Sequence, residues 1–318
     1  MKRPIPSLGA RRRFTIAGHA MDAPALDPGL YVVATPIGNL GDITLRALAT
    51  LAAVDTVACE DTRQTARLLD RYAIDARRVA YNEHNADRAG PGLLDAVADG
   101  AAVALVSDAG TPLVSDPGQR LVAQAVDRGL PVVALPGASA PLAALVASGL
   151  ASTPFTFAGF APNRRGALAA WAKAHADRPE TLVAFEAPTR IAATLAVLAR
   201  EMGDGRRAVV ARELTKMHET LHRGTLRGLA DAMGAMERVR GEIVLVIEGA
   251  DRAARMWDDA AVDAALLEAL ATMGTRDASA QVAAASGRAK RELYRRALDL
   301  APDDATGRAR NGRDGERP

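Results

Sequence analysis

Several features that would place a protein outside the cytoplasm are scarce or missing in this sequence. Cys59 is its single cysteine, so the chain forms no internal disulfide. No apolar run approaches the roughly 20 residues of a membrane-spanning helix. Basic residues number 40 and acidic residues 38, and this near balance identifies no acidic partner. We therefore predict a cytoplasmic protein that has no membrane partner.

Two phosphate-binding motifs are also absent. No G-x-G-x-x-G follows the first predicted strand, and no G-x-x-x-x-G-K-[ST] occurs anywhere in the chain. These are the loops that cradle a pyrophosphate or a triphosphate. A nucleoside-like ligand without a large phosphate group is therefore favoured over a dinucleotide.

Basic residues gather at the two chain ends. Five Lys and Arg residues and no acid precede Asp22, and four arginines lie among the last residues. We predict a basic flexible tail over residues 1–28 and a flexible tail over 303–318. The first tail lacks the apolar core of a signal peptide. Met21 as an alternative start and a transit peptide both remain open.

From residue 30 onward, short apolar runs alternate with segments of helical period, which is typical of parallel βαβ units. The helix after the first strand has Asp42 as its expected N-cap. We predict two consecutive α/β domains, residues 29–139 and 140–250, with a cleft between them. The predicted strands are 30–35, 54–60, 101–107 and 130–136, a weaker one near 77–82, and then 155–160, 181–186, 208–214 and 242–249.

The strand pattern stops after Gly249, and residues 251–302 are predicted to form a small helical domain. Gly287 separates two of its helices. On the second helix, Ala289, Leu293 and Ala297 share one face, while Arg288, Arg291 and Arg295 share another. This pattern indicates a helix-turn-helix-like element with a basic outer side. An ordinary helical hairpin with a solvated charged face is the alternative.

Four unusual loops follow strands of the first predicted domain, at residues 35–42, 60–65, 107–118 and 135–140. They are rich in glycine, proline and aspartate, as in "SDAGTPLVSDPG". Glycine lets the backbone approach a ligand closely, and carboxyl ends of parallel strands meet at one edge of a sheet. We predict a ligand site at this edge. Four tight turns without a ligand are the alternative.

A zinc-protease pattern, H-E-x-x-H, occurs as "HETLH" at residues 218–222. In such proteases the pattern lies within a long helix. Here the strand-like run 208–214 precedes it and Gly224 follows it closely. We therefore expect a chance match and no metal site.

The loop sequences resemble those of a known family, the ribosomal RNA small subunit methyltransferase I group of the tetrapyrrole-methylase superfamily. The resemblance covers residues 30–249 almost continuously and extends to "AKRELYRRAL" near the end. The matching stretches are "TPIGNLGDITLRAL", "CEDTRQTARLL", "HNADR", "ALVSDAGTPLVSDPG", "LPGASA", "FAGFAP", "FEAPTRI", "ARELTKMHET" and "GEIVLVIEG".

The resemblance implies a class III methyltransferase fold that binds S-adenosylmethionine between its two domains, usually as a homodimer. The implied reaction methylates the ribose 2′-hydroxyl of a cytidine in 16S ribosomal RNA, at the decoding centre of the small subunit. The implied cofactor contacts are Pro36, Ile37, Gly38, Asp108, Ala109, Gly110, Thr111, Pro136, Gly137, Ala138, Ser139, Phe185 and Gly241.

Charged residues near predicted strand ends are candidates for the chemistry. A general base would come from Glu60, Asp61, Glu186 or Glu213, with Glu186 and Asp61 ranked first. Each of these carboxylates could instead form an ordinary ion pair. Lys216 is a candidate for stabilising a developing alkoxide. The candidate RNA contacts are Arg63, Arg164, Arg165, Arg190, Arg212, Arg288, Arg291 and Arg295.

Two other functions stay open at this point. One is a small-molecule methyltransferase of the same superfamily, against which the basic C-terminal helices and Arg164 with Arg165 argue. The other is a non-catalytic RNA-binding or ribosome-assembly protein that keeps the fold.

Overall fold

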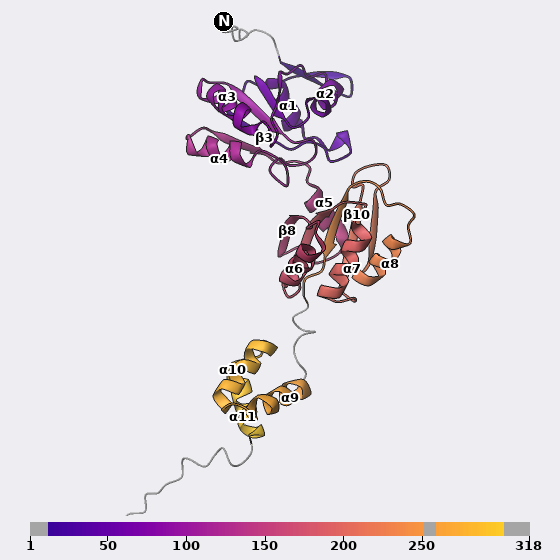
Figure 1. The fold of residues 1–318 in the computed structure, drawn as a ribbon. Coiled ribbons are helices and arrows are strands. Elements are labelled where there is room, and N and C mark those ends of the chain that lie inside the picture. The colour runs from indigo at the N-terminus through magenta and orange to yellow at the C-terminus, as the bar shows by residue number, and fades with distance from the viewer. Residues whose placement is uncertain (1–11, 251–258, 302–318) are drawn as a thin grey trace, which may run out of the picture. The chain divides into compact units, whose positions relative to one another are not determined.

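A computed structural model describes residues 12–250 and 259–301 (Figure 1). The chain forms two compact units, Met1–Gly249 and Ala250–Pro318. The predicted tails at residues 1–11 and 303–318 lie outside the described residues. Because residues 1–249 form a single unit, the division at 139/140 remains a prediction.

The first sheet is entirely parallel, and its strand order is β5-β4-β6-β3-β7. Its central strands are buried on both faces, which explains their uninterrupted apolar sequences. All five predicted strands of this region are present. Their bounds are β3 Gly29–Val33, β4 Thr56–Cys59, β5 Arg78–Ala80, β6 Ala102–Val106 and β7 Val132–Leu135.

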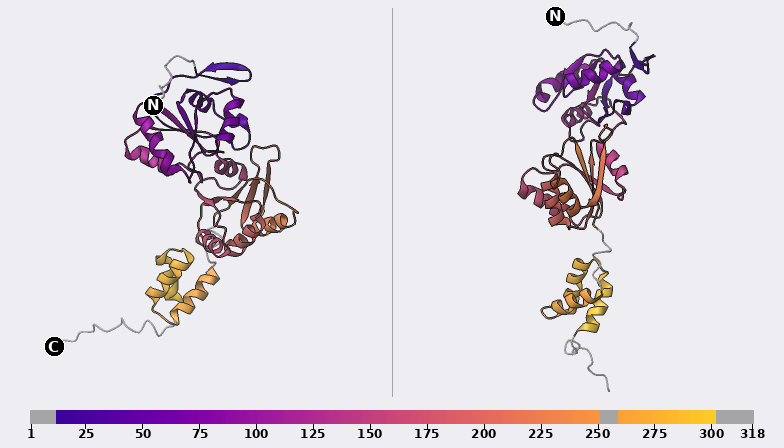
Figure 2. Two further views of the ribbon diagram at one scale, coloured as in Figure 1. Left: turned by 45° about the horizontal axis from the view of Figure 1, so that its top comes forward. Right: turned by 90° about the vertical axis from the view of Figure 1, so that its right-hand side faces the viewer.

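Helices cover both faces of the first sheet (Figures 1 and 2). Helices α1 (Leu45–Ala53) and α2 (Thr62–Arg71) pack against one face through Leu48, Leu51 and Leu69. Helices α3 (Ala86–Ala98) and α4 (Gln119–Asp127) form a second apolar cluster on the other face. The expected N-cap Asp42 is wrong. Residues Leu40–Asp42 form a 3₁₀ turn, and the Thr44 hydroxyl caps α1 by accepting a hydrogen bond from the Ala47 N–H at 3.1 Å.

A β-hairpin occupies part of the region that was predicted to be a flexible tail. Strands β1 (Arg13–Ile16) and β2 (His19–Asp22) pair antiparallel. Phe14 is buried in the core beside α1, and the Thr15 N–H donates to the Tyr72 carbonyl at 2.7 Å. The prediction is therefore wrong for these residues, because two four-residue strands give too little alternation to be recognised.

The second sheet has the strand order β11-β10-β12-β9-β8 and is mixed. Strands β8 and β9 pair in parallel, whereas β9-β12, β12-β10 and β10-β11 are antiparallel, so the parallel βαβ pattern indicated by the sequence applies to only one pair of this sheet. Strand β11 was not predicted. The bounds are β8 Phe155–Phe160, β9 Thr181–Glu186, β10 Arg207–Arg212, β11 Thr220–Thr225 and β12 Ile243–Ile247.

Helices also cover both faces of the second sheet. Helices α6 (Arg165–His175), α7 (Ile191–Met202) and α8 (Leu226–Gly234) share one apolar cluster with it. Helix α5 (Ala140–Ser148) packs on the opposite face through Ala144 and Leu145. The predicted α/β class is confirmed for both sheets.

The second unit consists of helices α9 (Asp259–Leu270), α10 (Thr275–Ser286) and α11 (Lys290–Leu300) around a small core. Gly287 ends α10 with a φ of +70°, a left-handed conformation that glycine adopts without strain. The predicted helical character of this region is therefore confirmed. In the two described segments of the chain, no helix has both the length and the apolar character needed to cross a membrane.

Candidate active site

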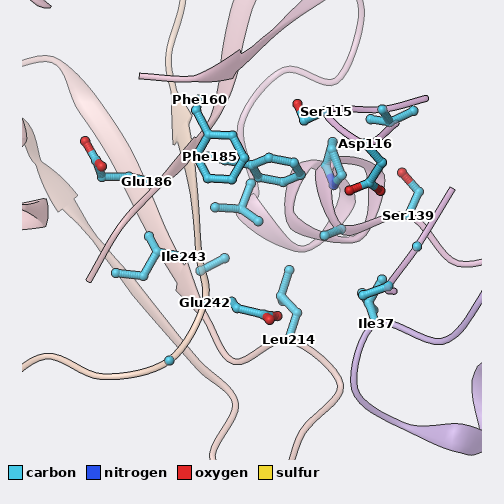
Figure 3. A pocket seen from close by; sticks show the side chains of 18 of the residues that line it. Ile37, Ser115, Asp116, Ser139, Phe160, Phe185, Glu186, Leu214, Glu242 and Ile243 are labelled. Atoms are coloured by element: carbon cyan, nitrogen blue, oxygen red, sulfur yellow. The ribbon is translucent and has the colours of Figure 1, made fainter. Parts of the chain in front are cut away.

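A cavity of about 290 Å³ lies where loops of the first sheet meet the second sheet (Figure 3). Loops that follow β3, β6 and β7 supply one wall, as expected for the carboxyl edge of a parallel sheet. Of the four predicted loops, the one at residues 60–65 contributes no residue to the lining of this cavity. The lining residues are Ile37, Ala109, Gly110, Thr111, Val114, Ser115, Asp116, Ser139, Ala140, Pro141, Phe160, Phe185, Glu186, Ala187, Pro188, Ala211, Leu214, Gly241, Glu242, Ile243 and Val244.

Backbone hydrogen bonds fix the loops of the first wall. Thr35 and Gly110 exchange two N–H···O bonds of 2.8 and 3.0 Å, and the Thr111 hydroxyl donates to the Ala138 carbonyl at 3.0 Å. Gly110 has a φ of +83°, and a Cβ atom at Gly137 would lie 2.7 Å from the Cβ of Ala34. These two glycines therefore allow a close approach that a larger residue would prevent.

About half of the predicted cofactor residues line this cavity. They are Ile37, Ala109, Gly110, Thr111, Ser139, Phe185 and Gly241. Six others lie outside the lining, and of these Gly137 and Ala138 support it from behind. The six are Pro36, Gly38, Asp108, Pro136, Gly137 and Ala138.

Glu186, a first-ranked candidate for the base, is a buried structural carboxylate. Its side chain is 0% exposed and pairs with Arg190. It also accepts hydrogen bonds from the Ala187 N–H at 2.6 Å and the Thr194 hydroxyl at 2.5 Å. Arg190 donates to the Ala161 carbonyl as well. Glu186 and Arg190 are thus paired with each other in the structure, and a catalytic Glu186 and an RNA-binding Arg190 remain predictions.

Glu213 and Lys216 form an ion pair beside the cavity. The Lys216 ammonium lies 2.9 Å from Glu213 and 3.1 Å from Glu242. Hydrogen bonds from Lys216 and from the Glu242 N–H lower the pKa of Glu213. A Cβ atom at Gly38 would lie 2.4 Å from the Lys216 Cγ. Lys216 thus packs on the first loop, and Glu213 is poorly suited to accept a proton at neutral pH.

Glu60, Asp61 and Asp108 lie together behind the first wall. Asp61 caps α2 by accepting from the Arg63 N–H at 2.8 Å, and the Arg63 side chain also binds it. These hydrogen bonds lower the pKa of Asp61. Asp108 accepts from the Asp61 N–H at 3.0 Å. The structure therefore gives Asp61 and Asp108 roles in holding the loops.

Asp116 is the residue that the sequence reasoning missed. Its half-buried side chain lines the cavity in Figure 3. Burial and the nearby charge of Glu60 raise the pKa of Asp116 to about 6, although a hydrogen bond from Ser107 acts in the opposite direction. Its place in "SDPG", within the loop already singled out, was the available signal. Other missed lining residues include Ser115, Phe160, Leu214 and Glu242.

Known proteins match this chain along most of its length. The family described as Tetrapyrrole (Corrin/Porphyrin) Methylases matches residues 29–230, and the family described as RsmI C-terminal HTH domain matches residues 258–301. The protein named Ribosomal RNA small subunit methyltransferase I of Mesorhizobium japonicum is 51% identical over 275 residues, which are 86% of this chain and 93% of that one. The chain belongs to the ribosomal RNA small subunit methyltransferase I family.

Solved structures agree with the ribosomal RNA small subunit methyltransferase I family in fold. A diphthine synthase has a TM-score of 0.54 at 16% identity, covering 69% of this chain and 89% of that chain. A Thermus thermophilus uroporphyrin-III C-methyltransferase, complexed with S-adenosylhomocysteine, has a TM-score of 0.50 at 21% identity and covers 69% and 96%. The predicted tetrapyrrole-methylase fold is confirmed. Membership of this methyltransferase family also confirms S-adenosylmethionine as the expected cofactor.

The arginines predicted to contact RNA differ in their solvent exposure and in their pairing with other residues of the protein. Arg164 and Arg165 are exposed at the N-terminus of α6, and Arg291 and Arg295 are exposed on α11. Arg63 is exposed but paired with Asp61.

Two further candidates are held internally. Arg212 donates to the Thr220 hydroxyl and the Arg240 carbonyl. Arg288 is only 16% exposed and pairs with Asp259 and Glu292. The expectation that Arg288 shares the basic outer face is therefore wrong.

The "HETLH" segment is not helical in this methyltransferase. Its last three residues belong to β11, and His222 lies opposite Val210 of β10. Within residues 12–250 and 259–301, no cluster of His, Cys, Asp and Glu side chains is arranged to hold a metal ion. The segment therefore lacks the long helix in which the zinc-protease pattern occurs.

Proposed function

We propose that this protein transfers a methyl group from S-adenosylmethionine to the ribose 2′-hydroxyl of a cytidine in 16S ribosomal RNA. The proposed target lies at the decoding centre of the small subunit. The observation that carries the proposal is the cavity that combines loops of the first sheet with residues of the second (Figure 3). Family membership supports the ribosomal substrate, because the relatives' names state it for those proteins.

The chemistry of the cavity fits a sulfonium nucleoside. Ile37, Leu214 and Val244 offer apolar walls for a purine ring, and the hydroxyl groups of Thr111 and Ser139 can hydrogen-bond a ribose. A volume of about 290 Å³ is near the lower bound, roughly 300 Å³, of ligand pockets. We propose that these residues, with Gly110, Phe185 and Gly241, hold the cofactor.

The protein's own contribution is mainly alignment of the acceptor. S-adenosylmethionine supplies an already activated methyl group. The loops around Gly110 and Ser139 hold the donor side rigidly, so the acceptor oxygen needs to be placed in line with the methyl group. We propose that Lys216, held between Glu213 and Glu242, stabilises negative charge that develops on this oxygen. Glu60 is one of the four predicted bases, and its pKa is raised. Burial is the main cause, and the negative charges of Asp108, Glu83 and Asp61 add to it.

Exposed arginines provide the RNA-binding side of the proposal. Arg164 and Arg165 stand at the first turn of α6, where the backbone N–H groups also attract phosphate. On α11, Arg291 and Arg295 flank Tyr294, which is 41% exposed. A cationic face with an aromatic ring suits single-stranded RNA, because phosphates bind the arginines and a base stacks on the ring. Arg63 is a further proposed phosphate contact.

We also propose that the protein acts as a homodimer in the cytoplasm, where its ribosomal substrate is assembled. Helix α5 exposes Leu142 and Val146, by 50% and 76%, one turn apart on its outer face. Strand β8 lies at an edge of the second sheet. An apolar helix face next to the active-site loop is a surface that a second copy would cover.

The decisive experiment uses small ribosomal subunits from cells that lack the modification. The subunits are incubated with the protein and S-adenosylmethionine carrying a labelled methyl group, and the modified nucleotide is mapped by mass spectrometry. We expect one labelled cytidine. Its methyl group should stay with the sugar when the nucleobase is cleaved off, which places the methyl group on the ribose. A label on a base, or on no RNA, would contradict the proposal.

A cavity variant separates catalysis from RNA binding in the same assay. Ser139→Trp fills the cavity and is expected to abolish labelling while RNA binding persists. Val126→Trp, at a side chain 61% exposed on α4, is the control for adding the same ring elsewhere. Labelling of a tetrapyrrole or another small molecule would favour the first alternative function. Full ribosome binding without any labelling would favour the non-catalytic one.

A further inference from the structure

Asp116 places a carboxylate in the cavity wall (Figure 3). Its neighbours include Glu60 from the end of β4, Asp108 from its own loop and the Ser107 hydroxyl. No ion pair with a Lys or Arg joins these neighbours in the part of the chain that the structure describes. Two neighbouring carboxylates and partial burial make this position unfavourable for an uncompensated anion.

Aromatic rings add a second preference for positive charge. Phe160 and Phe185 both line the cavity, and their ring centroids lie 5.2 Å apart. Figure 3 shows them in the same cavity as the Asp116 carboxylate. The faces of aromatic rings attract cations electrostatically. Asp116 and the rings therefore favour a ligand that carries a positive charge within an apolar framework.

The proposed donor and its product differ in this property. S-adenosylmethionine carries a sulfonium charge, whereas S-adenosylhomocysteine has a neutral thioether. When the methyl group leaves, the C–S electron pair stays on sulfur, and the acceptor hydroxyl releases a proton, so charge is conserved. The two ligands otherwise present the same groups to the cavity.

We propose that Asp116 is the residue by which the cavity prefers the charged methyl donor over the neutral product. This inference depends on the proposed function, because it assigns the cavity to the nucleoside. It adds that the carboxylate attracts the sulfonium and loses this attraction after transfer. Product release and donor entry are then favoured by the same side chain.

The preference depends on pH in a definite direction. Above about pH 6 Asp116 is ionised and attracts the sulfonium. As the pH falls through about 6, the carboxyl group takes up a proton and the attraction disappears. Binding of the donor lowers the pKa of Asp116, so donor binding near this pH releases a proton. Binding of the product releases none from this residue.

Calorimetric titration of the full-length protein with each nucleoside tests the inference. In the unaltered protein, we expect the ratio of donor to product affinity to be about fivefold higher at about pH 8 than at about pH 5. In Asp116→Asn the ratio stays at its low-pH value throughout. Asp127→Asn, an exposed site on the following helix with the same change of charge, is the matched control and keeps the pH dependence.

The outcomes separate this inference from the proposed function. If Asp116→Asn keeps the ratio of the unaltered protein, or weakens both nucleosides equally, Asp116 does not discriminate and the inference is overturned. The cavity assignment survives in that case. If neither nucleoside binds the unaltered protein, or if Ser139→Trp leaves their binding unchanged, the cavity assignment itself fails.

Discussion

At the scale of single residues, the structure separates carboxylates that are paired with a basic side chain from Asp116, a cavity-lining carboxylate that forms no such pair within the described residues. Glu186, Asp61 and Glu213 all stand near strand ends, which is why the sequence marks them as candidates. Each has a hydrogen-bonding partner from a nearby residue: Arg190, Arg63 and Lys216. All three partners lie within four residues of their carboxylate, so the sequence offered these ion pairs as an alternative. It did not show whether each pair forms, because that depends on the local backbone conformation at the strand ends.

Glu186→Gln is expected to lower stability and leave the chemistry intact. The neutral amide weakens the hydrogen bonds from Arg190, Thr194 and the Ala187 N–H, at a cost of about 2 kcal/mol in the free energy of unfolding. Denaturant unfolding measures this cost. Methylation per folded molecule should remain unchanged. Glu248→Gln, which removes a more exposed pair with Arg207, is the control. Unchanged stability with lost methylation would restore Glu186 as a catalytic group.

Asp108 does not line the cavity, but Asp108→Asn is expected to lower the pKa of Asp116. The charge of Asp108 contributes to the raised pKa of Asp116, so its removal lowers that pKa. The donor preference should then persist to lower pH than in the unaltered protein. Affinity titrations across this range measure the shift. A preference that shifts to higher pH would contradict the assignment of charges around Asp116.

At the scale of secondary-structure elements, burial decided what the sequence could predict. Strands β3, β4 and β6 are buried along their whole length and appear as continuous apolar runs. Strand β11, "TLHRGT", lies at a sheet edge with no buried residue, so its polar sequence gave no strand signal. Missing it also left the antiparallel pairing of β10 unseen. The cavity loops were predicted well because glycine and proline cluster after buried strands.

Helices α9 and α11 are joined by an acid-sensitive ion-pair network. Arg296 binds Asp263 and Asp259, and Arg288 binds Asp259. Hydrogen bonds from these arginines lower the pKa of both aspartates. Their contribution to stability is therefore present above the unfolded-state pKa, about 3.9, and is lost as the pH falls through the lower folded-state pKa.

Hydrogen exchange of the α9 and α11 amides in the full-length protein measures this effect. Asp263→Asn is expected to speed their exchange at neutral pH and to reduce the further acceleration on acidification. Asp299→Asn, at an exposed site on α11 outside the network, serves as the control. If both variants exchange alike, the network does not stabilise the helices.

At the scale of the whole molecule, the residues that line the cavity fall between positions 37 and 244 of the sequence, and the helical unit is formed by later residues, Ala250–Pro318. A variant that ends at Ala250 should therefore bind S-adenosylhomocysteine with unchanged affinity. Loss of the α11 arginines should reduce methylation of small subunits by about tenfold at physiological salt. Calorimetry and the labelling assay measure the two effects.

A full-length variant provides the comparison for this truncation. Arg291→Gln with Arg295→Gln keeps the helices and removes two exposed charges, so an intermediate loss of methylation is expected. If the truncated protein no longer binds S-adenosylhomocysteine, the helical unit supports the fold of the cavity and is not an RNA-binding element alone.

The cavity draws its walls from both sheets, so an occupant joins the two halves of the first unit. Opening either half destroys the binding site, and a ligand at a hundred times its dissociation constant opposes that opening by about 2.7 kcal/mol. Proteases cleave transiently opened molecules, so a saturated protein should be degraded more slowly than an empty one. The lifetime of this enzyme in a cell would then follow the cell's supply of its methyl donor.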